Sequence, residues 1–247
     1  MMGLNQNNIH KYLFFLFLAL VLSVVLFIII KYNVEGEKNI PFNITKLMVI
    51  SSAETQELEL NENLYQANII QKNDIYLAIE KNANYKKQDA IKRVTLNNFN
   101  IVKRGNAGTL EIYRTAIEGK KYEYNEKYEI NDSMEFVGDL NTNLKMEKMT
   151  IANQGGLLEF SMILNDLGKL TYGENENITS DGTLLKRLNL DTEDIKTEIS
   201  FDMIMELSSG KTFKTTINLE LPTGDIAKEG VYTYENMELN KLVFKRT

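Results

Sequence analysis

The chain has 247 residues, of which 43% are hydrophobic and 25% charged, and its formal net charge at pH 7 is −6. It contains no cysteine, which excludes disulfides, thiol nucleophiles and thiolate metal sites. Its single histidine is His10, so the rest of the chain has no imidazole for catalytic triads or for metal sites that need histidine. Carboxylate chemistry, Ser–Lys chemistry or no catalysis remain, and we expect neither a cofactor nor a metal ion.

The most distinctive element is the apolar stretch Tyr12–Ile30, which Ser23 alone interrupts with a polar side chain. As a helix it is about 28 Å long, close to the hydrocarbon thickness of a bilayer. A cleaved signal peptide has a shorter apolar core and a small-x-small cleavage site, and a buried soluble helix has a polar stripe. Neither pattern is present. We therefore predict an uncleaved transmembrane helix at 12–30, between a tail at 1–11 and a linker at 31–40.

The charges beside this span give conflicting indications of its orientation. Lys31, Lys38 and Lys46 follow the span, whereas Lys11 is the one lysine before it, and the positive-inside rule then favours a cytoplasmic body. A short tail before a first span usually stays inside, however, and large domains translocate largely regardless of charge. We expect residues 1–11 in the cytoplasm and the body outside the membrane.

The body that follows is acidic. Setting aside Lys11 and Lys31 leaves 26 of the 28 basic residues against 34 acidic ones, a net charge of about −8. Binding to nucleic acid and electrostatic docking to anionic lipid both require clustered lysine and arginine. The overall charge therefore argues against both partners. The richness in Asn, Lys and Ile, with two prolines and no tryptophan, is typical of a bacterial protein.

Most of the body alternates apolar and polar residues with the period of a β-strand. The turn-forming residues between the alternating runs predict four connections between consecutive strands, and the apolar phase shift near Asn97–Asn98 predicts a β-bulge. A short helix is expected at Thr183–Leu188. The methionines at 203 and 205 share one face with other apolar residues, which is typical of core packing. The four expected connections are 72–74 between strands 64–71 and 75–81, 104–108 between 92–103 and 109–116, 153–156 between 144–152 and 157–164, and 208–211 between 195–207 and 213–221.

Residues 118–143 are rich in charge and tyrosine and favour a boundary between two units. About seven strand candidates fall on each side, which is the number of strands in an Ig-like sandwich. We therefore predict an all-β body of two Ig-like β-sandwich lobes, at 41–130 and 131–247. The alternative is one large β-sandwich in which 118–143 is a surface excursion.

Several short strings resemble functional motifs but lack the required context. Residues 208–211 match S-x-x-K and overlap a Gly-Lys-Thr string, yet they lie between strand patterns and are expected to form a hairpin turn without catalytic role. Asp139, Asn141 and Asn143 occupy the first three acidic or amide positions of a calcium loop, but Leu144 and Thr150 stand where Gly and Glu belong. A calcium site of another kind there, or around 174–177 and Asp181, is an alternative, but we expect both segments to be solvated loops. No catalytic and no metal-binding residue is predicted.

The one candidate contact site that we name is in the span itself. Ala19 and Ser23 are four residues apart and lie on one helix face, and such a small-x-x-x-small notch permits close approach of a second helix. Alternatively, the Ser23 hydroxyl bonds back to the carbonyl of Ala19 in its own helix.

Together these features favour a non-enzymatic role. We expect a membrane-anchored, extracytoplasmic protein that acts as a binding or assembly module of the bacterial cell envelope. It would contact the lipid bilayer through residues 12–30 and a protein partner through its body. One alternative is a carboxylate-dependent glycan hydrolase, whose sign would be a buried carboxylate pair in a cleft. The other is a sensor or regulatory subunit of a membrane complex.

Overall fold

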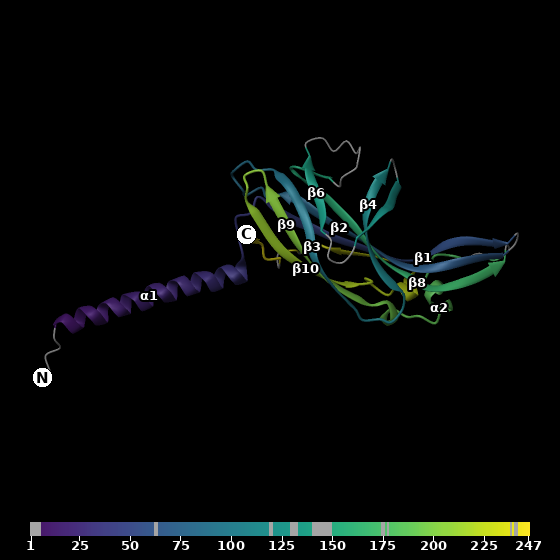
Figure 1. Cartoon of the computed structure of the whole chain (residues 1–247), viewed down its shortest axis with the longest axis horizontal. Coiled ribbons are helices and arrows are strands. Elements are labelled where there is room, and N and C mark those ends of the chain that lie inside the picture. The colour runs from purple at the N-terminus through teal and green to yellow at the C-terminus, as the bar shows by residue number, and fades with distance from the viewer. Residues whose placement is uncertain are drawn as a thin grey trace.

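The computed structural model describes residues 6–61, 64–118, 121–128, 133–139, 150–173, 176, 178–237, 239 and 242–247. A long N-terminal helix projects from a body that is mostly β-strand (Figure 1). The helices are α1 (Gln6–Glu35), α2 (Thr183–Arg187) and α3 (Ile226–Glu229), with a 3-10 turn η1 (Glu193–Ile195). The strands are β1 (Phe42–Asn61), β2 (Leu64–Lys81), β3 (Ile91–Lys103), β4 (Thr109–Glu118), β5 (Lys121–Tyr128), β6 (Met134–Asp139), β7 (Thr150–Ala152), β8 (Gly155–Gly173), β9 (Thr197–Leu207), β10 (Thr212–Leu221), β11 (Val231–Asn236) and β12 (Lys245–Arg246).

The helix α1 includes the whole predicted span. Residues Ile9–Glu35 are long and apolar enough to cross a membrane, and none of the most apolar window is buried against the body. Large side chains such as Leu16 and Phe17 are about two-thirds exposed, so the apolar part of the helix is exposed all round. A helix of this length and composition near the N-terminus is compatible with a membrane anchor or with a signal sequence.

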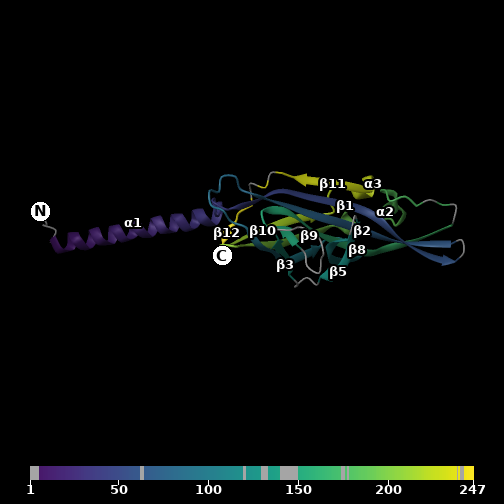
Figure 2. The ribbon, with the colours of Figure 1, turned by 90° about the horizontal axis from the view of Figure 1, so that it is seen from above.

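The body consists of two six-stranded sheets. Sheet A has the strand order β11-β1-β2-β8-β4-β5, and sheet B has the order β12-β10-β9-β3-β6-β7. Neighbouring strands are antiparallel except for the short parallel pair β6 and β7. Figure 2 shows both sheets extending along the same axis, away from the end of α1.

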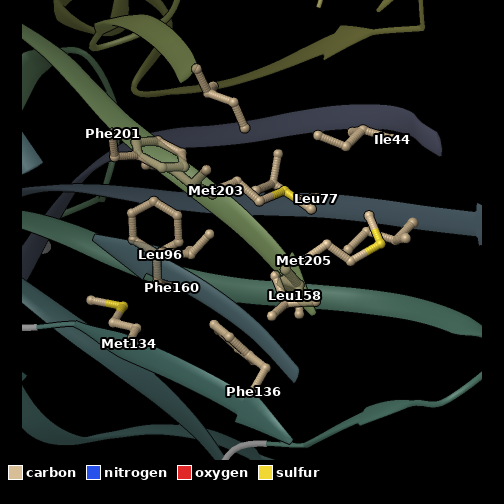
Figure 3. Close-up of a cluster of buried hydrophobic side chains, with 14 of the residues drawn as sticks. Ile44, Leu77, Leu96, Met134, Phe136, Leu158, Phe160, Phe201, Met203 and Met205 are labelled. Atoms are coloured by element: carbon tan, nitrogen blue, oxygen red, sulfur yellow. The ribbon is translucent and has the colours of Figure 1, made fainter. Parts of the chain in front are cut away.

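One hydrophobic core lies between the two sheets (Figure 3). At its centre, Phe160 of sheet A meets Phe201 of sheet B edge to face, with ring centroids 5.3 Å apart, and Phe99 lies 5.9 Å from Phe160. Met203 and Met205 are fully buried in the same core. This confirms that the methionine row on β9 fills the core, because its period places these side chains on the face toward sheet A.

Strands from both halves of the chain alternate within each sheet. In sheet A, β2 pairs with β8, and in sheet B, β3 pairs with β9. The pairing therefore does not follow the expected division between 41–130 and 131–247. The mostly β body is as expected, but each expected lobe contributes strands to both sheets.

Three of the four expected connections differ from the structure. Residues 72–74 lie inside β2, because the polar side chains of this segment find partners on neighbouring strands, as described below. Residues 104–108 pass from β3 in sheet B to β4 in sheet A, and residues 153–156 lead from β7 in sheet B into β8 in sheet A. The strands beside these two segments are therefore not hairpin partners, and residues 144–149 lie outside the described chain.

The remaining local expectations are confirmed. β9 and β10 form a hairpin around the turn at 208–211. The register of β3 against β9 shifts between Asn97 and Asn100, where Asn98 has a left-handed φ of 52°. The helix expected at Thr183–Leu188 is α2.

The strands β1, β2 and β8 continue past their neighbours at the end of the body opposite α1 (Figures 1 and 2). We call this extension the distal blade: residues 53–61, 64–70 and 167–173. Its base packs on α2, α3 and η1 through a second buried cluster that includes Ile69, Leu185 and Ile226.

Candidate functional site

The candidate residues in the span make a contact within α1. The Ser23 hydroxyl donates to the carbonyl oxygen of Ala19 at 2.8 Å. The hydroxyl is therefore satisfied inside its own helix, in the alternative arrangement that the spacing allowed. Both residues remain exposed on the surface of α1.

The turn at 208–211 attaches β9 and β10 to the loop between β2 and β3. The Ser209 hydroxyl donates to Asp89 Oδ2 at 2.6 Å, and the Ser209 amide donates to Asp89 Oδ1 at 3.2 Å. Lys211 Nζ donates to the Tyr85 hydroxyl at 2.8 Å. Ser208, the serine of the S-x-x-K string, contributes its backbone amide, which donates to the carbonyl of Ala90 at 2.9 Å. These contacts hold the turn against the loop.

The two calcium-loop candidates are described only in part. Asp139 ends β6, and 140–149 lie outside the described residues, as do 174, 175 and 177. The carboxylate of Asp181 accepts from the Thr183 amide at 2.8 Å, and hydrogen bonds from Thr183 and Thr179 lower the pKa of Asp181. Within the described residues, no group of three His, Cys, Asp or Glu side chains is arranged to hold a metal ion.

Sheet A carries two neighbouring carboxylates on the face away from the core. Asp74 on β2 pairs in register with Ser161 on β8, and Tyr76 pairs with Glu159. Asp74 and Glu159 are therefore diagonal cross-strand neighbours, a position with a typical separation of about 7–8 Å. Ser161 Oγ donates to Asp74 Oδ1 at 2.5 Å, and Lys72 Nζ lies 3.1 Å from Asp74 Oδ2.

Burial changes the acidity of both carboxyl groups. Loss of hydration raises the pKa of Asp74, although the hydrogen bond from Ser161 and the charge of Lys72 act in the opposite direction. Loss of hydration also raises the pKa of Glu159 to about 7, with a further increase from the charge of Asp74 and a decrease from the hydrogen bond of Tyr76. Glu159 therefore changes its protonation state near neutral pH.

A different feature lies where α1 joins the body. The Glu37 amide donates to the carbonyl of Phe244 at 2.6 Å, and the Arg246 amide donates to the Tyr32 hydroxyl at 2.6 Å. The C-terminal segment is thereby attached to the last turns of α1, and Figure 1 shows the C-terminus beside the end of this helix.

A cavity of about 450 Å³ opens at this junction. Phe213 and Tyr85, which are 3% and 7% exposed, form its apolar part. Its other described lining residues include three lysines and one arginine against one carboxylate, that of Glu37. We call it the basic cavity; it is lined by Glu37, Asn39, Asn84, Tyr85, Lys86, Lys87, Lys211, Phe213 and Arg246.

Sequence reasoning did not find the basic cavity or the carboxylate pair. The cations of the cavity come from three separate segments, and the overall charge of the body has the opposite sign. Asp74 was assigned to a turn, which separated it from Glu159. The polar stretch at 84–89 with its two adjacent lysines was the available signal for the cavity.

The comparisons with known proteins provide no relative. No protein-family model matches the chain, and neither a curated protein nor a solved structure matches it.

Proposed function

We propose that the protein is anchored in the cytoplasmic membrane by α1, and that its β-sandwich body lies outside the membrane as a non-catalytic binding or assembly module of the bacterial cell envelope. The contacts at the junction favour a retained anchor over a removed signal sequence. The last turns of α1 are hydrogen-bonded to the C-terminal segment through Tyr32 and Arg246, a contact that would be lost if the helix were removed. The notch at Ala19 and Ser23 offers a second helix a place for close approach.

The distal blade is the observation that carries the binding role. β1 pairs with β11 only over Leu47–Ser52, and β8 pairs with β4 only up to Asn165. In the blade, after Ser52 on β1 and after Asn165 on β8, each of these two strands pairs only with β2 in the described chain. The other edge of each strand is therefore not paired with a strand among the described residues. Open strand edges readily accept a strand from another chain. The blade presents two such edges at the end of the body farthest from the anchor.

Cross-linking from the blade tests this role. A photoreactive amino acid at Gln56 on β1 or Thr171 on β8, both exposed, should capture a specific envelope protein in the producing bacterium. Asn100, which is exposed on β3 in sheet B, is the matched control and should capture little of it. The proposal fails if the adducts from Asn100 equal those from the blade, or if neither blade position gives one.

The carboxylate pair favours a second candidate, a carboxylate-dependent glycan hydrolase. A carboxyl group with a pKa near 7 suits a general acid, and a second carboxylate at this spacing suits a base or a nucleophile. Neither Asp74 nor Glu159 lines the basic cavity. Our proposal expects no release of reducing ends from cell-wall glycan between pH 5 and 7. Release that is lost in both Asp74→Asn and Glu159→Gln would instead assign the hydrolase.

A further inference from the structure

We propose that the basic cavity binds the phosphate headgroup of an anionic lipid in the leaflet from which α1 emerges. The inference rests on the anchoring part of the proposed function and is independent of any protein partner. Its consequence is that the body has a preferred orientation on the membrane surface, set by a second contact besides the span.

The position of the cavity suits such a contact. The apolar span ends at Ile30, and Tyr32 lies about 3 Å further along the helix axis. The headgroup layer of one leaflet is about 5–7 Å thick, so the Tyr32 hydroxyl is at headgroup depth. This hydroxyl accepts from the backbone amide of Arg246, and Arg246 lines the cavity. The cavity therefore opens beside the headgroup layer.

The cations of the cavity are also available to a ligand. On the outer face of sheet B, basic side chains are paired with carboxylates: Arg93 with Glu206 at 2.8 Å, Arg104 with Glu198 at 2.7 Å, and Lys214 with Asp202 at 2.7 Å. For Lys86, Lys87 and Arg246, the described part of the chain shows no such ion pair, and all three are exposed. Unpaired cations thus gather at one end of an otherwise acidic body.

The wall of the cavity is fixed by the contact of Lys211 with Tyr85, and the nearby carboxylate of Asp89 is bound to Ser209 instead of to a lysine of the cavity. Lys211 Nζ donates to the Tyr85 hydroxyl and lies 5.5 Å from the centroid of its ring. An ammonium group has three donors, so two remain for phosphate oxygens. The Asp89 carboxylate accepts from the amide and hydroxyl of Ser209, which holds it against the turn. Glu37 is the one carboxylate among the described lining residues.

The anchor makes a lipid headgroup a better occupant than a free phosphate ion. A tethered body meets headgroups at a high effective concentration, so individually weak contacts add up. Lys86 and Lys87 form an exposed rim rather than an enclosed pocket, which suits a surface of many phosphates. The attraction of each basic residue to anionic lipid acts only within about a Debye length of the membrane, a condition that the junction with α1 meets.

The absence of cysteine makes a direct test straightforward. Full-length protein with Asn84→Cys, labelled with a fluorophore at this position on the cavity, is reconstituted in nanodiscs of phosphatidylcholine alone or with one quarter phosphatidylglycerol. Headgroup-labelled nitroxide lipid then reports contact by quenching. We expect at least about threefold more quenching in the anionic discs. High salt should remove the difference.

Variants identify the residues responsible. Lys86→Gln, Lys87→Gln and Arg246→Gln together should reduce quenching in anionic discs to the level of the neutral discs. The matched control, Lys169→Gln, Arg187→Gln and Lys228→Gln, removes three exposed cations far from α1 and should leave quenching unchanged. Circular dichroism verifies that both triple variants are folded.

Three results would overturn the inference. The first is equal quenching in neutral and anionic discs, and the second is an anionic response that survives in the cavity variant. The third is a change of the label on adding inorganic phosphate to neutral discs, which would assign the cavity to a soluble ligand. Failure of the protein to elute with discs of either composition would contradict the anchoring role itself, and it is seen before any quenching is measured.

Discussion

A chain of polar contacts links Ser51 and Asn73 of sheet A to Thr223, which follows β10 of sheet B. The Ser51 hydroxyl donates to Asn73 Oδ1 at 2.7 Å and lies 3.0 Å from the Thr223 hydroxyl. Asn73 Nδ2 donates to the carbonyl of Met162 on β8 at 3.4 Å. Buried polar groups cost little when they are paired, so Asn73 can remain in an extended strand although its residue type favours a turn.

Replacing Ser51 by alanine tests this interpretation. The change leaves the buried Asn73 Oδ1 without its hydroxyl donor and the Thr223 amide without its acceptor, so we expect a loss of about 1–3 kcal/mol in the free energy of unfolding. Urea denaturation of the reconstituted or detergent-solubilised protein measures it. Ser180→Ala is the matched control, because Ser180 is exposed, and equal losses in the two variants would contradict the role of the buried chain.

Glu159 gives the body a pH dependence whose sign follows from its acidity. The folded-state pKa of about 7 lies above the ordinary value of 4.5, so the folded state holds the proton more tightly than the unfolded state does. The stability that this group contributes is fully present below pH 4.5 and is lost as the pH rises through 7. In Glu159→Gln the side chain is neutral at every pH.

The expected result is a difference in melting temperature that grows with pH. Relative to the wild type, Glu159→Gln should gain stability between pH 5 and pH 8, because the wild type must then hold a poorly hydrated charge beside Asp74. Thermal melts at four or five pH values measure this trend. Glu80→Gln, at an exposed position on β2, should give a curve parallel to the wild type, and a parallel curve for Glu159→Gln would refute the assignment.

At the level of elements, strand positions were more predictable than strand partners. The hairpin of β9 and β10 follows from uninterrupted alternation on both sides of a short turn. The same signal precedes and follows 104–108, but there the chain crosses to the other sheet. Periodicity reports which face of a strand is buried, and both sheets of a sandwich bury one face of each strand. It therefore cannot report the sheet to which the next strand belongs.

The crossover is held by close backbone contact with the η1 region. The amides of Arg104 and Gly105 both donate to the carbonyl of Lys196, at 2.8 and 2.9 Å. A Cβ atom on Gly105 would lie 1.9 Å from the carbonyl oxygen of Asp194. Because a backbone atom cannot move aside as a flexible side chain can, this position requires glycine.

We expect Gly105→Ala to destabilise the protein by about 1–3 kcal/mol, the usual range for overpacking a rigid site. Gly173→Ala on β8 is the control, since a Cβ there has no neighbouring atom within 4 Å. Urea denaturation curves of both variants provide the comparison. Matching midpoints would show that the crossover does not dock as described.

At the level of the whole molecule, composition predicted the net charge of the body but not where its charged residues gather. The absence of cysteine, the position of the apolar span and the mostly β body were all readable, because each depends on residue type and local order. The basic cavity was not, since Lys86, Lys211 and Arg246 come together only through the fold. The net charge of the body has the opposite sign, so a sum over the chain concealed the cluster.

The arrangement of the sheets also predicts how the body unfolds. The central core joins Phe99 from the first half of the chain to Phe160 and Phe201 from the second. A fragment of residues 36–247, which lacks the span but keeps the contact of Glu37 with Phe244, should therefore show a β spectrum by circular dichroism. It should melt in a single cooperative transition by calorimetry.

Residues 41–130 alone provide the decisive comparison. In this fragment β2 lacks its neighbour β8, and β3 lacks its neighbour β9. The apolar faces that these strands turn toward the core would then be exposed, and hydrophobic burial is the main favourable contribution to folding. We expect the short fragment to be unfolded or aggregated. A cooperative melt of residues 41–130, or two separate transitions in residues 36–247, would instead favour two independent lobes.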